Sequence, residues 1–271
     1  MWTILTGCRR RNDVGSQGIS GTGHTHILRI HGSQLEVRSG RAARQLGIIV
    51  SNTPGANAVA VAELTIALIL DLLRPILPAV QGTRAGGWPR KKGFSLVGKT
   101  VGILGCGAIG KEVIKRLTGF GCTILAYDLF EDREFAGEYE IQYLSLEEIL
   151  PRADIITLHL PDTPETRGIV DGEFISKMKT GAWLVNTARG ELLDETALAN
   201  ALVNGKLRGA ALDVYLQEPP AKDSPLLGLE QVITTPHMGA HADSATNAMG
   251  RMALDECLRV LRGEAPQYQV S

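Results

Sequence analysis

The stretch VGILGCGAIGKEVIKRLTGFGCTILAYD, which runs from Val101 to Asp128, decides the fold of this chain. It opens with an apolar run, Val101 to Leu104, that is long enough only for a strand buried on both faces. A helical pattern of apolar residues follows, and a second apolar run, Ile124 to Tyr127, ends at an aspartate. The order strand, helix, strand predicts two parallel strands joined by a crossover helix.

Three glycines, Gly105, Gly107 and Gly110, stand between the first strand and the helix with the spacing G-x-G-x-x-G. Glycines at this spacing make a tight turn, leave room for a pyrophosphate against bare backbone and allow close helix–strand packing. The N-terminus of the helix adds unpaired N–H groups and a positive dipole end for the phosphates. The carboxylate of Asp128 can accept hydrogen bonds from both hydroxyls of an adenosine ribose and repels a 2′-phosphate. This favours NAD over NADP. The alternative, a glycine-rich turn that binds nothing, is disfavoured by the strand, the helix and the carboxylate around the motif.

Composition narrows the class of protein. The chain has 271 residues, of which 44% are hydrophobic, and a net charge of −1, so we expect about two domains and no nucleic-acid or membrane partner. The four cysteines are widely spaced without a C-x-x-C pair, which is typical of a reducing compartment. The chain shows neither a signal-peptide pattern nor an apolar run of membrane-spanning length. These features predict a soluble, cytoplasmic protein.

A long segment, Asn57 to Val80, is predicted to be a helix that is apolar nearly all round. Such a helix belongs either in a core or in an oligomer interface; we expect it to serve both purposes, in a homodimer. Pro75 and Pro78 should bend or end it. We expect Gly82 to Phe94 to form a connecting arm anchored by Trp88.

After Asp128 the strand–helix alternation continues and predicts an α/β fold with a doubly wound parallel sheet, a Rossmann-type NAD domain, beside a reduced second domain. The expected strands are Ile155–His159, Trp183–Asn186, Ala210–Asp213 and Val232–Thr235, and the expected helices are Asp171–Lys179, Asp194–Asn204 and Asp243–Arg262.

Residues whose side chains can bind an anion or transfer a proton follow the predicted strands. Ligands of an open α/β sheet bind beyond the carboxyl ends of its strands. The guanidinium of Arg189 suits a carboxylate. His237 can exchange a proton near neutral pH, and Glu218, in a Glu-Pro-Pro turn, could fix the tautomer of that histidine. Taken alone, each residue has a purely structural explanation, and their joint placement favours a site.

Five stretches, NTPGANAVAVAEL, GKTVGILGCGAIG, NTARGELLDETAL, GAALDVYLQEPP and TPHMGAHADSA, resemble the D-isomer-specific 2-hydroxyacid dehydrogenase family over roughly residues 42–268. The resemblance implies NAD as cofactor and a small 2-hydroxy acid as substrate. It assigns Arg189 to the substrate carboxylate, His237 to acid–base catalysis and Glu218 to the support of His237. The residues that it implies for NAD binding are Gly105, Gly107, Ala108, Ile109, Gly110, Asp128, Leu160, Thr187, Ala188, Arg189, Asp213, His237, Gly239 and Ala240.

The N-terminal part departs from the family pattern. Members carry a substrate domain about twice as long, with an Arg-x-Gly-x-Gly-x-Asp loop, where this chain reads Arg29-Ile-His-Gly-Ser-Gln-Leu-Glu36. We interpret residues 1–51 as a truncated or mis-framed substrate domain, residues 52–240 as the NAD domain with its dimerisation helix and arm, and residues 241–271 as a helix returning to the substrate domain.

Three interpretations stay open: an active NAD-dependent dehydrogenase, a glyoxylate or hydroxypyruvate reductase of the same family, and a non-catalytic NAD-binding remnant. A metal site at His237, His241 and Asp243 is not expected, because hydride transfer needs none.

Overall fold

The computed structural model describes residues 3–7, 26–30 and 49–270. It divides the chain into a larger unit, residues 58–241, and a smaller unit formed by residues 1–57 and 242–271. Most of the Arg29–Glu36 segment, from His31 onward, lies outside the described residues.

The larger unit is built on a seven-stranded sheet in which every neighbouring pair is parallel. In spatial order the strands are β10 (Val232–Thr234), β9 (Leu207–Leu212), β8 (Ala182–Asn186), β7 (Ile155–Leu158), β4 (Thr100–Leu104), β5 (Thr123–Tyr127) and β6 (Gln142–Tyr143). The chain runs outward from β4 in one direction through β5 and β6, and in the other through β7 to β10. The predicted doubly wound sheet is confirmed, and its strand order reverses between β4 and β7, where such sheets bind ligands.

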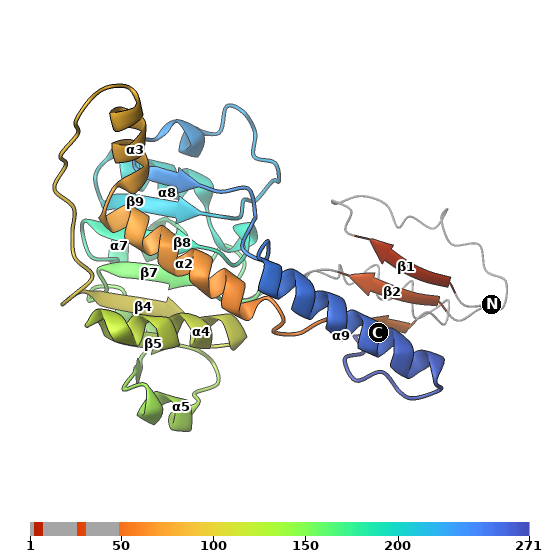
Figure 1. The fold of residues 1–271 in the computed structure, drawn as a ribbon. Helices are drawn as coiled ribbons and strands as arrows, with labels where there is room; N and C mark the ends of the chain where they lie inside the picture. The colour runs from red at the N-terminus through yellow and green to blue at the C-terminus, as the bar shows by residue number, and fades with distance from the viewer. Residues whose placement is uncertain (1–2, 8–25, 31–48, 271) are drawn as a thin grey trace. The chain divides into compact units, whose positions relative to one another are not determined.

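Helices cover both faces of this sheet (Figure 1). The helices of the larger unit are α2 (Ala58–Leu73), α3 (Ile76–Arg84), α4 (Ala108–Leu117), α5 (Arg133–Glu138), α6 (Leu146–Ile149), α7 (Gly172–Lys177) and α8 (Glu195–Val203), with short 3₁₀ turns η1 (Thr118–Phe120), η2 (Gly190–Leu192) and η3 (Pro225–Gly228). α3 has no buried residue and therefore covers neither face.

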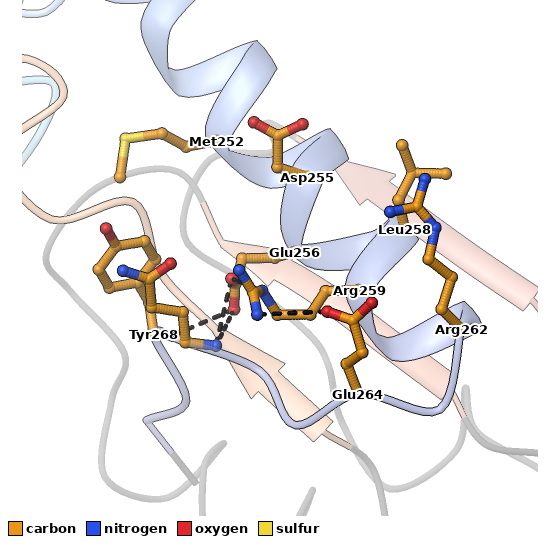
Figure 2. A pocket seen from close by; sticks show the side chains of 9 residues that line it. Met252, Asp255, Glu256, Leu258, Arg259, Arg262, Glu264 and Tyr268 are labelled. Atoms are coloured by element: carbon orange, nitrogen blue, oxygen red, sulfur yellow. Dashed lines mark hydrogen bonds and ion pairs between the residues drawn. The ribbon is translucent and has the colours of Figure 1, made fainter.

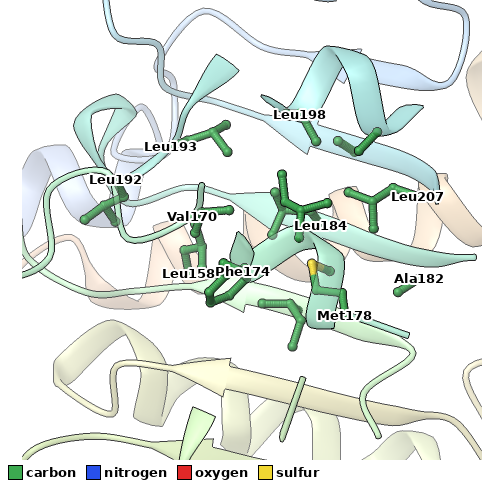
Figure 3. Packing of buried hydrophobic residues seen from close by; sticks show 14 of the residues in the cluster. Leu158, Val170, Phe174, Met178, Ala182, Leu184, Leu192, Leu193, Leu198 and Leu207 are labelled. Carbon is green, nitrogen blue, oxygen red and sulfur yellow. The ribbon is translucent and has the colours of Figure 1, made fainter. Parts of the chain in front are cut away.

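The two hydrophobic cores follow from the alternation of side chains along the buried strands. On β8, Leu184 points to the core that α7 and α8 cover, which Figure 3 shows around Phe174, Met178 and Leu198. Its neighbour Trp183 points to the core beneath α2 and α4. The strands are apolar on both faces because both faces are covered.

The apolar helix ends where proline requires it. α2 stops at Leu73, and α3 begins after Pro75. Asp71 bridges the break, since its Oδ1 accepts from the backbone N–H groups of Ile76 (2.7 Å) and Leu77 (3.1 Å). Pro78 is tolerated within the first turn of α3, where a backbone N–H has no partner inside the helix.

The expectation that Trp88 anchors the arm is wrong. Trp88 is 79% exposed. Phe94 makes the contact instead, edge-on against the buried Trp183 with ring centroids 5.3 Å apart. Sequence indicates which residues are aromatic, but the reach of the arm decides which of them meets the sheet.

The smaller unit has a parallel sheet in the order β1 (Thr3–Gly7), β2 (His26–Ile30), β3 (Ile49–Ser51), together with α9 (Asp243–Leu261). The tail after α9 folds back on this helix, because the backbone N–H groups of Gln267 and Tyr268 both donate to the carboxylate of Glu256 (Figure 2). Within the described ranges, no helix combines the length and the apolar character needed to cross a membrane.

Candidate active site

The glycine loop lies at the carboxyl end of β4. Gly105 has φ of +99°, a conformation that L side chains rarely adopt, and a Cβ on it would lie 2.6 Å from the carbonyl carbon of His159. A Cβ on Gly110 would come within 2.0 Å of the carbonyl oxygen of Gly105, so α4 reaches the strand only because residue 110 has no side chain.

Gly107 differs from the other two glycines, because a Cβ there would meet nothing within 4 Å. It precedes α4 and provides no side-chain cap for the first N–H groups of that helix. Open space beside an uncapped helix N-terminus is what a dinucleotide pyrophosphate requires. The residues present therefore fit NAD at this end of the sheet.

Asp128 follows β5 and holds the glycine loop. Its Oδ2 accepts from the N–H of Cys106 at 2.6 Å, and its Oδ1 accepts from the N–H of Phe130 at 3.0 Å. Each carboxylate oxygen keeps a second lone pair, so the two ribose hydroxyls remain within its capacity.

Cys106, inside the loop, is 5% exposed, and burial raises the pKa of its thiol to about 12. A thiol in this state is a packing group and not a reactive one.

The end of β7 lies directly beside the glycine loop. His159 donates its backbone N–H to Leu104 and brings Leu160, 7% exposed, to the switch point between β4 and β7. The Nε2 of His159 lies 3.1 Å from Oγ1 of Thr157, and its buried Nδ1 has no protein partner among the described residues. Burial lowers the pKa of this imidazole to about 3.

The turn after β8 carries Thr187, Ala188 and Arg189. Thr187 and Ala188 are each 6% exposed. The guanidinium of Arg189 donates from Nη1 to the carbonyl oxygen of Ala188 at 2.5 Å. Burial lowers the pKa of Arg189, an effect that the nearby carboxylates of Glu191 and Glu218 oppose. A guanidinium held partly out of water binds an anion more strongly than an exposed one.

Glu218 and His237 form a hydrogen-bonded pair. Glu218 Oε2 lies 2.8 Å from Nδ1 of His237, and Glu218 Oε1 accepts from the N–H of Tyr215 at 3.2 Å. The carboxylate accepts from Nδ1–H, so it fixes the tautomer and leaves Nε2 for a ligand. The side chain of His237 is 47% exposed, so the ring is accessible.

Asp213, 1% exposed, holds the turn on which His237 stands. Its Oδ1 accepts from Thr235 Oγ1 (2.6 Å) and the N–H of Met238 (2.9 Å), and its Oδ2 accepts from the N–H of Gly239 (2.9 Å). His237 itself has φ of +52°, a left-handed conformation that costs a non-glycine residue about 1–3 kcal/mol. The three bonds to the carboxylate compensate for this strain.

The structure thus brings the predicted residues of the larger unit to one edge of the sheet. Arg189 lies near Glu218, Glu218 binds His237, and Gly239 contacts Asp213. Ala240 follows Gly239 and is half-buried. In the described part of the chain, no group of three or more His, Cys, Asp or Glu side chains gathers as metal ligands would.

Sequence reasoning missed the residues that support the site from within. Thr65 on α2 is fully buried, and its hydroxyl lies 2.8 Å from that of Thr187. Tyr215 bridges the ends of β9 and β10, with its hydroxyl 3.1 Å from the carbonyl oxygens of Leu212 and Thr235. For Thr65 the signal was a polar residue in an otherwise apolar segment, whereas the sequence around Tyr215 offers no comparable signal.

A family model and several known proteins match this chain. Residues 66–239 match the family described as D-isomer specific 2-hydroxyacid dehydrogenase, NAD binding domain. The chain is 46% identical over 233 residues to the D-3-phosphoglycerate dehydrogenase of Methanocaldococcus jannaschii, covering 85% of this chain and 44% of that protein. It is 41% identical over 226 residues to the human protein of the same name, covering 83% of this chain and 42% of that one. The chain therefore spans less than half the length of these relatives.

Solved structures of similar proteins share the fold. The TT0316 protein of Thermus thermophilus is 36% identical with a TM-score of 0.81, over 90% of this chain and 78% of that one. The D-lactate dehydrogenase of Escherichia coli is 30% identical with a TM-score of 0.84, again over 90% and 78%.

Proposed function

The chain belongs to the D-isomer specific 2-hydroxyacid dehydrogenase family, and from this premise we propose that it transfers a hydride between a D-2-hydroxy acid and NAD. One observation supports the proposal above the others. The Nδ1 of His237 lies 2.8 Å from Glu218 in the same part of the sheet edge as the half-buried guanidinium of Arg189. An oriented acid–base group next to an anion holder is the set of groups that oxidation of a hydroxy acid needs.

When bound, NAD would supply the hydride acceptor for oxidation of the substrate and, as NADH, the hydride donor for reduction. The protein holds this cofactor through the glycine loop and the N-terminus of α4, with Asp128 at the ribose. Leu160, Thr187, Ala188, Asp213, Gly239 and Ala240 line the remainder of the cofactor in this proposal.

The substrate is bound and activated by three side chains. Arg189 binds the substrate carboxylate through charge-assisted hydrogen bonds and polarises the neighbouring carbonyl group of the 2-oxo acid. His237 takes the hydroxyl proton at Nε2 during oxidation and gives it back during reduction. Glu218 accepts from Nδ1–H throughout and stabilises the imidazolium that forms.

D-3-phosphoglycerate is the substrate we favour, because curated relatives at 46% and 38% identity carry the name D-3-phosphoglycerate dehydrogenase. A glyoxylate or hydroxypyruvate reductase is the alternative within the family, and a glyoxylate reductase is among the similar solved structures, at 34% identity. Asp128 favours NAD over NADP for either reaction.

The domain division follows the proposed roles. Residues 52–240 act as the NAD domain with its dimerisation helix and arm. Residues 1–51 and 241–271 belong to the part that serves the substrate.

The experiment is NADH formation by the purified chain with D-3-phosphoglycerate and a small panel of other D-2-hydroxy acids, beside a calorimetric titration with NAD. We expect NAD binding and turnover with at least one acid, and loss of turnover in His237→Gln with unchanged affinity for NAD. Binding without turnover on any acid would refute the enzyme and leave the third interpretation, a non-catalytic NAD-binding remnant.

A homodimer in the cytoplasm is part of the proposal. α3 exposes three apolar side chains, Ile76 (51%), Leu77 (50%) and Val80 (39%), and such side chains are covered when two copies associate. Light scattering on a sizing column should give about twice the 29.1 kDa of one chain, and Leu77→Lys should lower it. The thiols of Cys106 and Cys122 are free, as is usual in a reducing compartment.

A further inference from the structure

Asn186, the last residue of β8, is fully buried at a position where an apolar residue is expected. Its register neighbours are Leu158 on β7 and Leu212 on β9. A primary amide between two leucines loses its hydration, so it persists only where other polar groups satisfy it.

Both ends of the amide bind the turn that follows. Nδ2 donates to the carbonyl oxygen of Arg189 at 2.8 Å, and Oδ1 accepts from the N–H of Ala188 at 3.0 Å. A longer contact of 3.4 Å joins the same Arg189 carbonyl to the N–H of Leu192. The side chain of Asn186 is thus the closer of the two donors to the main chain of Arg189.

The same turn determines where the guanidinium lies. Nη1 of Arg189 donates to the carbonyl oxygen of Ala188. The N–H of the same Ala188 donates to Oδ1 of Asn186. A movement of Ala188 therefore moves both the backbone of Arg189 and the acceptor that holds its side chain.

Two other features limit the turn. The hydroxyl of Thr65 donates to the carbonyl of Val61 and accepts from Thr187. A Cβ on Gly190 would come within 2.0 Å of the carbonyl carbon of Tyr215, so the turn lies flat against the loop that leads to Glu218.

Asn186 also reaches the neighbouring strand end, since its backbone carbonyl accepts from the N–H of Asp213 at 3.0 Å. Asn186 therefore links the turn that carries Arg189 to Asp213, the residue that holds the turn of His237.

We propose that Asn186 is a positioning residue that presents the guanidinium of Arg189 to the substrate carboxylate. The role rests on the proposed function and specifies it, because it names the internal support of the substrate-binding group. Asn186 itself does not touch the substrate.

The test is Asn186→Asp, which keeps the shape of the side chain. One carboxylate oxygen can still accept from Ala188, but the other faces the carbonyl oxygen of Arg189 and repels it. We expect the KM for the hydroxy acid to rise by about tenfold or more, because a displacement of 1 Å of a positioning group costs up to about 10²-fold. The affinity for NAD should fall by a smaller factor than the one by which the KM rises, because most of the proposed cofactor-binding residues, the glycine loop and Asp128 among them, lie outside this turn.

The pH dependence separates positioning from general damage. Burial favours the protonated form of the introduced carboxyl, and its O–H can donate to Arg189 as the amide does. The ratio of the variant KM to the wild-type KM should therefore fall toward one as the pH is lowered from about 8 to about 6. A merely structural defect does not recover in this way.

Asn204→Asp is the matched control. Its Oδ1 also accepts a backbone N–H two residues ahead, from Lys206 at 3.0 Å, but at an exposed helix end away from the site. We expect wild-type KM at every pH. Asn186→Ser, which can satisfy only one of the two turn groups, is the second variant if Asn186→Asp does not fold, and it should also raise KM.

Three results overturn the proposal. The first is a folded variant with wild-type KM, and the second is failure of both variants to fold. The third is a higher KM that comes with weaker NAD binding and a lower melting temperature by similar proportions and does not recover at low pH. These differ from failure of the proposed function, which is absence of turnover in the wild type. In that case oxalate, a planar dicarboxylate, is titrated into the wild-type and variant complexes with NADH. Weaker oxalate binding by the variant supports the role of Asn186, whereas equal binding, or none by the wild type, overturns it.

Discussion

His159 should make this fold sensitive to mild acid. Burial lowers the pKa of its imidazole to about 3, from an ordinary value of 6.5. The residue keeps a small exposed surface, but Nδ1 itself is buried with no protein partner in the described structure, so a proton there finds no acceptor. The folded state thus holds His159 neutral.

The sign and the size follow from linkage. Between about pH 6.5 and about pH 3 the unfolded chain binds a proton that the folded chain does not, so the free energy of unfolding falls as the pH falls through this window. With these two pKa values, His159 alone removes about 1 kcal/mol on going from about pH 7.5 to pH 5.5, and about 3 kcal/mol by pH 4.5.

The assay is urea unfolding of the wild type and His159→Gln at these pH values, followed by the fluorescence of the buried Trp183 with the other two tryptophans replaced by phenylalanine. Other groups contribute to acid unfolding equally in both proteins, so the difference between them isolates the imidazole. We expect the wild type to lose the stated free energy relative to the variant, and His241→Gln, at an exposed histidine, to behave as the wild type does. Parallel curves for the wild type and His159→Gln would refute the reasoning, because they would mean that the folded state accepts the proton.

Three further substitutions test the site. Gly110→Ala places a Cβ 2.0 Å from a carbonyl oxygen of the glycine loop and should weaken NAD binding by about tenfold or more in calorimetry, whereas Gly119→Ala, with nothing within 4 Å, should bind NAD as the wild type does. Asp128→Ser removes the carboxylate that repels a 2′-phosphate, so the ratio of NADP to NAD affinity should rise by about tenfold or more; an unchanged ratio would contradict its assignment to the ribose. Glu218→Gln turns an amide toward Nδ1 of His237 and disfavours the useful tautomer, so kcat should fall by about 10²–10⁴-fold at constant NAD affinity, and a wild-type kcat would exclude a supporting role.

The fold was predictable because it depends on short-range patterns. An apolar run followed by spaced glycines and an apolar helix already specifies one βαβ unit, and each later repetition adds a strand on the same sheet. The break after Leu73 was predictable from Pro75 for the same reason, since the missing N–H and fixed φ act locally. The conclusion that polar groups share one edge needed only the parallel direction of the strands.

Contacts between distant segments were not predictable. Trp88 has the larger ring, yet Phe94 packs on Trp183, because the geometry of the arm and not hydrophobicity decides which aromatic side chain meets the sheet. The bond between Thr65 and Thr187 joins residues that are 122 positions apart, and no local pattern connects them. Helix–sheet packing alone creates it.

The polar residues at the strand ends also form hydrogen bonds to the backbone of the turns around the site. Parallel strands leave the main chain of the following turn without partners in the sheet, and a buried turn must find others. Here Asp128, Asn186 and Asp213, each at or just after the end of its strand, accept backbone N–H groups from a nearby turn. The glycine loop, the Arg189 turn and the His237 turn are held in this way, so the polar strand ends build the turns that carry the site. Substitutions at these three positions should therefore displace a turn as well as remove a ligand contact, and their effects on binding exceed what one lost hydrogen bond explains.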